Sequence, residues 1–379
     1  MMIPGPTHVP TRVLAAMATP MVNHRGQEFT ALHGEVQAGL KRVFGTVGDL
    51  VIYPGSGTGG MEAALVNLFS PGDRILGVSI GAFGDRFVQI ARRFGLQVDA
   101  LEFDWGRAAD PGAIAERLAA DGEHQIKGIL VTHNETSTGV VNPLEAIAKA
   151  RGAHPALLVV DAVSSLGAVE VRADDWGLDA VVTGSQKALM IPPGLAILSL
   201  GPRAWAAAEK ATSPRFYWDV LAYKKGFAKA STPYTPALSQ WFALREALRM
   251  LEEEGLENAY RRHRLLGEMT RAGATALGLE LLATEQWSPA VTALYSPVSP
   301  AALRKRMRED YGVVVAGGQG RVSESVFRIG HVGCVEPLDL LATLAALEMS
   351  LSQEGRQVHL GEGVAAAQRV WMKERSGEL

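Results

Sequence analysis

Short apolar runs alternate with amphipathic stretches from about residue 50 to residue 200. The apolar runs read LVIYP, DRILGVSI, LQVDALEF, IKGILVTH, ALLVVDA, DAVVTGS and LAILSL. Such runs, rich in Val, Ile and Leu, are typical of buried strands. Between several of them lie segments such as GDRFVQIARRFG and DPGAIAERLAA, with apolar residues at helical spacing. This alternation predicts an α/β fold with a mostly parallel, seven-stranded sheet, whose ligands bind beyond the carboxyl ends of the strands.

The pattern changes after about residue 236. PALSQWFALREALRMLEEEG predicts one long helix, and LENAYRRHRLLGEMTRAGATALG predicts a second. Short strand-like runs and two more helices follow, and the weakly patterned tail predicts little structure. The first twenty residues contain four prolines, which favours an extended arm of the kind that packs on a partner subunit. We therefore expect an arm (1–20), a large domain (21–254) and a smaller α+β C-terminal domain with the tail (255–379).

Composition narrows the function classes. Of 379 residues, 47% are hydrophobic and 20% are charged, as in an ordinary folded protein. The net charge of −3 offers no basic field for nucleic acid or an anionic membrane. The single cysteine, Cys334, excludes an internal disulfide and a cysteine-based metal cluster. With neither a membrane-spanning run nor a signal peptide pattern, the expectation is a cytoplasmic protein without a metal.

A glycine-rich turn follows the first predicted strand, in YPGSGTGGMEAALVNLF. The helix that begins there presents free N–H groups, and the glycines let the backbone approach a ligand. Ser56, Gly57 and Thr58 are therefore candidate phosphate contacts. The stretch is neither a Walker A loop nor a dinucleotide fingerprint. An ordinary capped turn would have the same pattern.

Two charged residues follow later predicted strands. Asp161 ends the apolar run LLVVD, and Lys187 follows DAVVTGSQ. A buried carboxylate needs a cationic partner, and an amine at an apolar sheet edge can become a nucleophile for a carbonyl. Each residue alone has a simpler interpretation: Asp161 as an acid that caps the next segment, and Lys187 as a surface lysine. Together with the phosphate turn at one sheet edge, they match what pyridoxal phosphate requires: a phosphate anchor, an acid for the pyridine nitrogen and a Schiff-base lysine.

With these residues in view, the sequence resembles the class V aminotransferases of fold-type I, and specifically the alanine–glyoxylate and serine–pyruvate group. The likeness extends over nearly the whole chain, through PGPTHVP, NHRGQEF, SGTGGMEA, HNETSTGV, VDAVSSLG, GSQKALMIPPG, STPYTPALSQWFALREAL and FRIGHVG. It implies the PLP-dependent transferase fold type I, a homodimer, and pyridoxal 5'-phosphate as cofactor. The implied reaction moves an amino group from a small amino acid to a small 2-oxo acid in ping-pong half-reactions.

The resemblance also implies roles for the residues around the cofactor. Lys187 would form the internal aldimine and carry the proton between the substrate Cα and the cofactor. Asp161 would pair with the pyridinium nitrogen, and Val163 would pack on one ring face. Phe83 matches the stacking aromatic, although a core phenylalanine at a helix start is an alternative. Thr136 matches a contact to the phenolic oxygen of the cofactor.

Other matches concern the phosphate and the partner subunit. Gln186 would hydrogen-bond the phosphate, and Thr235 matches a phosphate contact that the neighbouring subunit donates. The tyrosine of the relatives falls on Thr232 here, which leaves that contact open, with Tyr234 as a substitute.

Arg328, in FRIGH, matches the arginine that binds the substrate α-carboxylate; a surface arginine at a strand end is the alternative. Asn23 and Arg25 are further candidates, because the N-terminal segment lines the active site in relatives. We expect Cys334 to be a small buried residue and His331 to be structural.

Several alternatives stay open at this point. A desulfurase or selenocysteine lyase of the same fold would need a mobile catalytic cysteine, and Cys334 lies at a predicted strand-to-helix junction. A subunit without cofactor would be expected to lose part of the site, and a nucleotide-binding module lacks its motifs. For the amino donor, one arginine fits alanine, serine or glycine, whereas aspartate needs a second cation, for which Arg25 is a candidate. Ureidoglycine and aminophosphonates are further donors within the group.

Overall fold

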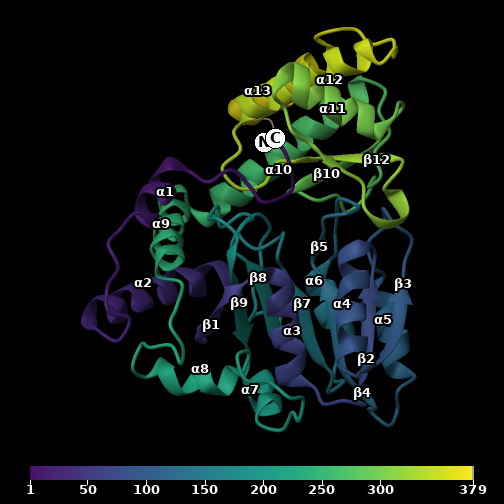
Figure 1. The fold of residues 1–379 in the computed structure, drawn as a ribbon. Helices are drawn as coiled ribbons and strands as arrows, with labels where there is room; N and C mark the ends of the chain where they lie inside the picture. The colour runs from purple at the N-terminus through teal and green to yellow at the C-terminus, as the bar shows by residue number, and fades with distance from the viewer. Residues whose placement is uncertain (378–379) are drawn as a thin grey trace.

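The computed structural model describes residues 1–377, and a seven-stranded sheet forms the centre of its larger part (Figure 1). In spatial order the strands are β1 (Leu50–Gly55), β9 (Gly194–Leu200), β8 (Ala180–Gly184), β7 (Leu157–Asp161), β4 (Ile126–Thr132), β2 (Arg74–Ser79) and β3 (Gln97–Glu102). The last five run parallel, and β9 is antiparallel to both of its neighbours. The predicted mostly parallel sheet is therefore confirmed, with all seven apolar runs forming strands.

Both faces of the sheet are buried because its side chains alternate between two hydrophobic clusters. Along β7, Leu158 and Val160 join one cluster, whereas Leu157 and Val159 join the other. A strand covered on both faces has no polar side, which explains the continuous apolar runs in the sequence.

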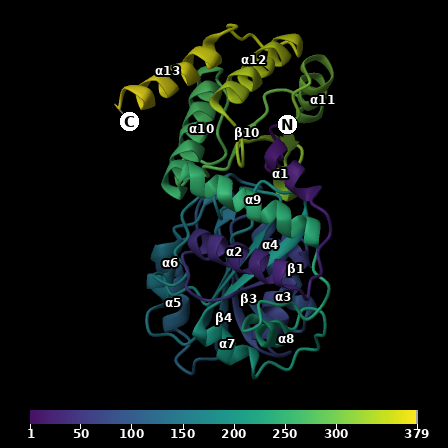
Figure 2. The same ribbon diagram turned by 90° about the vertical axis from the view of Figure 1, so that its left-hand side faces the viewer.

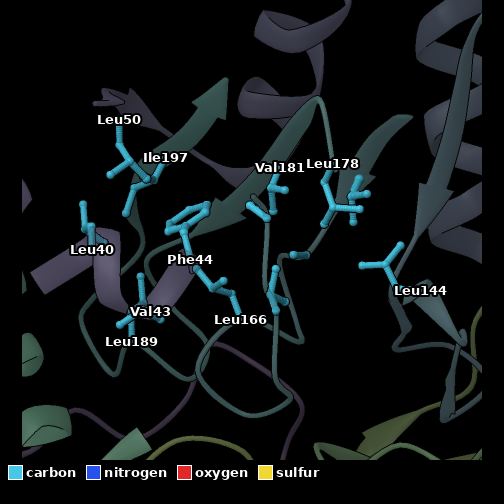
Figure 3. Packing of buried hydrophobic residues seen from close by; sticks show 14 of the residues in the cluster. Leu40, Val43, Phe44, Leu50, Leu144, Leu166, Leu178, Val181, Leu189 and Ile197 are labelled. Atoms are coloured by element: carbon cyan, nitrogen blue, oxygen red, sulfur yellow. The ribbon is translucent and has the colours of Figure 1, made fainter. Parts of the chain in front are cut away.

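Helices cover each face of the sheet. The first cluster is shared with α2 (Gln27–Phe44), α5 (Pro111–Ala119), α6 (Leu144–Arg151) and α9 (Leu238–Glu254). The second is shared with α3 (Gly57–Leu68), α4 (Ala82–Arg93), α7 (Pro202–Ala208) and α8 (Val220–Phe227). In the first cluster, Phe44 of α2 points toward the strands that carry Ile197 and Val181 (Figure 3). The short pair β5 (Asn134–Glu135) and β6 (Val140–Val141) lies beyond the end of β4.

The smaller part has its own sheet and its own cluster of buried residues. Its strands are β10 (Val291–Tyr295), β12 (Val326–Gly330) and β11 (Ala316–Gly317). Its helices are α10 (Leu256–Ala276), α11 (Pro300–Tyr311), α12 (Pro337–Gln353) and α13 (Glu362–Ser376), with a 3₁₀ turn at Gly320–Val322. The chain enters this part at Gly255, whose φ of +82° favours glycine and which separates α9 from α10 (Figure 2).

The two ends of the chain differ from the expectation. Within the arm, α1 (Thr11–Met17) is a helix packed against α9, and in the tail α13 packs against α10. Because α1 buries only Val13, it has no apolar periodicity that could be read. The first residues also belong to the body of the protein, since Met2 pairs with Val315 of the smaller part. None of the helices described is long and apolar enough to cross a bilayer.

Candidate active site

Lys187 follows β8 at the carboxyl end of the parallel strands. Its Nζ donates a hydrogen bond to the Pro4 carbonyl at 2.5 Å. Burial and, to a smaller extent, the charge of Arg328 together lower the pKa of the amine to about 8, whereas the charge of Asp161 acts in the opposite direction. Lys187 is therefore held in an interior site with a larger share of neutral amine near neutral pH than a surface lysine has.

Pro4, Gly5 and Thr7 of the N-terminal segment lie against Lys187. Thr7 donates from Oγ1 to the Lys187 carbonyl at 3.0 Å and from its N–H to the Gln186 carbonyl at 3.1 Å. At Gly5, with φ of +133°, a Cβ would collide with the Lys187 side chain, so glycine permits the close approach. The sequence pattern predicted an arm for a partner, and it did not indicate this contact within the chain.

Asp161 ends β7, beside β8. Its Oδ1 accepts the Val163 N–H at 2.9 Å, and its Oδ2 has only the distant Thr132 hydroxyl, at 3.5 Å. Burial and, to a smaller extent, the charge of Glu135 raise its pKa to about 6, against the opposing effect of the Val163 hydrogen bond. Asp161 has no salt bridge within residues 1–377, so Oδ2 keeps the capacity to accept a hydrogen bond from a cationic ligand.

The turn that the sequence predicts as an anion cradle lies immediately before α3. Ser56 caps α3, which begins with Gly57 and Thr58, and its Oγ accepts the Gly59 N–H at 3.5 Å. A Cβ on Gly57 would lie 2.5 Å from the Val163 side chain, so the turn and the residue beyond Asp161 are in close contact.

Gln186 lies at the same sheet edge as the cradle. A Cβ built on Gly184 would lie 2.9 Å from Gln186 Oε1 and 3.3 Å from the Gly57 nitrogen, which places these groups together. The Gln186 Oε1 atom is buried without a hydrogen-bond partner among the residues described. The Nε2 group of the same amide is a hydrogen-bond donor, and a donor beside a helix N-terminus fits a phosphate.

Arg328 comes from β12 of the smaller part and is only 5% exposed. Its Nε donates to the Gly317 carbonyl at 2.8 Å, and its Nη1 donates to the Thr136 carbonyl at 2.9 Å and to Gln319 Oε1 at 3.2 Å. Burial lowers its pKa to about 10, and the charge of Glu135 opposes that effect. Its Nη2 donates to no protein atom in the described part, so this edge of the guanidinium is available to a carboxylate.

Thr136 and Phe83 lie near these groups. Thr136 donates from Oγ1 to the Ser164 hydroxyl at 2.8 Å. Phe83 is the second residue of α4, and the guanidinium of Arg86 lies 4.7 Å from its ring centre. The charge of Arg86 lowers the pKa of both Lys187 and Asp161. Sequence reasoning missed Arg86, although its spacing of three residues from Phe83 on one helix is a usable signal.

Arg25 and Thr235 lie in a different environment, and both are exposed. The Arg25 guanidinium donates to the Ser231 hydroxyl at 2.7 Å, to the Thr232 carbonyl at 2.5 Å and to the Pro233 carbonyl at 3.3 Å. The structure therefore places Arg25 against the segment that leads to Thr235, and its hydrogen bonds go to that segment.

The neighbouring candidates are engaged in local bonds. Thr232 donates from Oγ1 to the Tyr234 carbonyl at 2.7 Å, and the Tyr234 hydroxyl donates to the Phe216 carbonyl at 3.1 Å. His331 is fully buried, and its ring nitrogens contact the Thr292 hydroxyl and the Pro289 carbonyl. Cys334 is half-buried, with its thiol 3.4 Å from the His8 carbonyl.

Comparisons with known proteins agree with this geometry. The family model described as aminotransferase class-V matches residues 3–335. The chain belongs to the class-V aminotransferases. A serine–glyoxylate aminotransferase of Methylorubrum extorquens is 43% identical, over 96% of this chain and 94% of its own. A protein named soluble hydrogenase 42 kDa subunit, from Anabaena cylindrica, is 44% identical over 98% of both chains. The crystal structure of the ureidoglycine–glyoxylate aminotransferase of Bacillus subtilis superposes with a TM-score of 0.93, at 31% identity, and covers 98% of this chain and 97% of its own.

These matches confirm the predicted family and the predicted fold. The protein is an aminotransferase, and its large sheet and smaller α+β part are those of the pyridoxal-phosphate fold-type I enzymes. The predicted roles of single residues remain predictions, and the structure adds their surroundings.

Proposed function

We propose that this aminotransferase uses pyridoxal 5'-phosphate to move an amino group from a small amino acid, alanine or serine, to a small 2-oxo acid, glyoxylate or pyruvate. The observation that carries the proposal is the meeting of Lys187, Asp161 and Arg328 in one buried site. The three groups come from the ends of β8 and β7 and from β12, and each influences the pKa of another.

The residues present fit the cofactor. Its phosphate matches the N-terminus of α3 at Ser56, Gly57 and Thr58, with the donor Nε2 group of the Gln186 amide near by. Asp161 offers Oδ2 to the N–H of a protonated ring nitrogen. Bound there, the cofactor supplies an aldehyde for amines and an electron sink for the negative charge left when a Cα–H bond breaks.

The protein groups then have distinct tasks. Lys187 supplies the amine that holds the cofactor and, when released, moves the proton at the substrate Cα. Its lowered pKa suits both tasks, because a neutral amine is needed for each. Arg328 binds the α-carboxylate through Nη2 while its bonds to Gly317 and Thr136 fix the plane of the guanidinium.

We further propose a homodimer in which the 231–235 segment of each subunit, with Thr235, completes the other subunit's phosphate site. Arg25 and this segment bond to each other on the exposed surface. Phe216 is 78% exposed next to them, and its ring lies 5.7 Å from that of Tyr234. Exposed aromatic rings beside polar groups are typical of a protein interface.

The alternatives have less support. Burial raises the pKa of the Cys334 thiol, which disfavours the thiolate that a desulfurase needs. The name of the Anabaena relative describes a hydrogenase subunit, but this chain keeps the lysine, acid, cradle and arginine. L-Aspartate as donor would need a cation besides Arg328, and both Nη atoms of Arg25 already donate within their own chain.

The test is a matrix of amino donors and acceptors. Purified protein loaded with pyridoxal phosphate is given L-serine or L-aspartate with glyoxylate or pyruvate, or L-alanine with glyoxylate, since alanine and pyruvate would only regenerate each other. The new amino acid is quantified by chromatography. We expect glycine to form from glyoxylate with serine or alanine as donor, and alanine to form from pyruvate with serine as donor. If only aspartate gave turnover, the proposed amino donors, alanine and serine, would be wrong. If no pair gave turnover although the protein binds the cofactor, the proposed substrates would be contradicted altogether.

A further inference from the structure

Glu135 is a fully buried acid for which the proposed reaction has no task. It lies in β5, immediately before Thr136, and it is 0% exposed. Burial raises the pKa of its carboxyl group, while bonds from Ser137 and Gly84 oppose that effect. A carboxylate buried this deeply is costly, so its hydrogen bonds show what it stabilises.

The carboxylate of Glu135 accepts hydrogen bonds from the first turn of α4. Oε2 accepts the Phe83 N–H at 3.1 Å and the Gly84 N–H at 3.0 Å. Oε1 accepts both the N–H and the hydroxyl of Ser137, at 3.0 and 2.6 Å. All four groups are donors, which an ionised carboxylate satisfies and an amide would not.

Ser137 completes the attachment. Its hydroxyl donates to Glu135 and accepts the Ala82 N–H at 2.9 Å. The first three N–H groups of α4 are therefore held from the 135–137 segment, whereas Gly81, at the N-cap, has no side chain to do so. A Cβ on Gly81 would collide with Glu135 and Ser137, so glycine allows the helix to start this close. A negative charge at this end also matches the helix dipole.

The middle residue of the 135–137 segment faces the other part of the molecule. The Thr136 carbonyl accepts the Nη1 bond of Arg328 at 2.9 Å, and the Thr136 hydroxyl donates to Ser164. The negative charge of Glu135 also supports the ionised form of Arg328. One short segment thus connects the helix that carries Phe83 with the arginine of β12.

We propose that Glu135 is a positioning residue for this site: by holding the first turn of α4 it fixes the Phe83 ring toward the cofactor, and by fixing the 135–137 segment it aligns the Thr136 carbonyl with Arg328. This inference rests on the proposed function. It assigns to Glu135 no contact with the substrate and no proton transfer.

The test compares three variants. Glu135→Gln keeps the shape but turns an NH₂ group toward backbone donors, and Ser137→Ala removes only the bond to Ala82 and the hydroxyl bond to Glu135. Glu145→Gln is the matched control, because Glu145 is exposed and its salt bridge among residues 1–377 is with Lys149. For each variant, the dissociation constant of pyridoxal phosphate, the visible circular dichroism of the bound cofactor, KM and kcat, and amide exchange at Phe83 and Gly84 are measured.

We expect Glu135→Gln to weaken cofactor binding by about tenfold, to reduce the visible dichroism and to speed exchange at the α4 start. Ser137→Ala is expected to act in the same direction by about threefold, and Glu145→Gln to match the wild type. KM for the amino donor should rise with Glu135→Gln, because Arg328 loses its alignment.

A lower melting temperature with unchanged dichroism, cofactor affinity and KM would show a merely structural role and overturn the proposal. If Glu135→Gln does not fold, wild-type values in Ser137→Ala would overturn it instead. Wild-type protein that binds no pyridoxal phosphate would overturn the proposed function itself, and the positioning role would fail with it.

Discussion

The site around Lys187 and the segment around Thr235 differ in how completely one chain forms them. Asp161 and Arg328 are buried and Lys187 is partly buried, and all three have shifted pKa values and lie among hydrogen bonds made within the chain. Arg25 and Thr235 are exposed, and the guanidinium of Arg25 bonds to the neighbouring 231–233 segment.

This difference indicates which region can act within one chain and which needs a partner subunit. Burial within one fold is enough to lower the pKa of an amine and raise that of a carboxyl group. An exposed arginine with hydrogen bonds at the surface acts through what it packs against, so its contribution depends on the partner subunit. We therefore expect substitutions in the buried site to act on chemistry and binding within a chain, and those in the exposed segment to act on the partner.

The largest effect is expected from Lys187→Ala. Removing the amine eliminates the group that moves the Cα proton, and kcat should fall by about 10³-fold. Steady-state assays with the best donor and acceptor pair measure it. Lys210→Ala is the control, because Lys210 is an exposed lysine, and it should keep wild-type turnover. Equal losses in both variants would contradict the assignment.

Arg328→Lys is expected to lower kcat/KM for the amino donor by about 100-fold, mainly through KM. Lysine keeps the charge but cannot hold the bonds to Gly317 and Thr136 while offering a flat edge to a carboxylate. Initial rates over a range of donor concentrations check this, with exposed Arg356→Lys as control. A wild-type KM in the Arg328→Lys variant would contradict the role of Arg328 in binding the substrate carboxylate.

Arg25→Ala should weaken cofactor binding by about tenfold, because the 231–235 segment loses three surface hydrogen bonds. Mixing it with Lys187→Ala distinguishes the two regions. In a hybrid dimer, the site with intact Lys187 receives an intact segment from the other subunit, and its affinity should recover. The exposed Arg369→Ala variant is the control. A deficit that persists in hybrids would place the effect of Arg25 within its own chain.

The smallest effect is a shift along the pH axis. In cofactor-free protein, the rate of pyridoxal phosphate uptake should rise with pH around a midpoint of about 8, where the Lys187 amine loses its proton. The folded pKa lies below the ordinary value of 10.5, so the unfolded chain binds more protons between these values. Lys187 therefore makes stability rise with pH from about 8 to 10.5. Stopped-flow uptake rates measure the midpoint, and one near 10.5 would contradict the burial argument.

Sequence reasoning found the residues that follow strands and missed those defined only by packing. Asp161 and Lys187 could be placed because the carboxyl ends of parallel strands share one edge, and both strands are continuous apolar runs. The contact of Gly5 with Lys187 joins positions more than 180 residues apart, and no local pattern encodes it.

Glu135 and Arg86 illustrate the same limit. Glu135 looks like any polar residue in HNETSTG, and only the fold brings the start of α4 onto its carboxylate. The helices α1 and α13 escaped prediction because each buries few residues, which leaves little periodicity.

The most direct test of the central claim is to locate the covalent attachment of the cofactor. Purified protein loaded with pyridoxal phosphate is reduced with borohydride, digested and mapped by mass spectrometry. The account predicts one pyridoxyl-modified peptide, the one containing Lys187, and its loss when an amino donor is added before reduction. Attachment at an exposed lysine such as Lys210, or no attachment at all, would contradict the account.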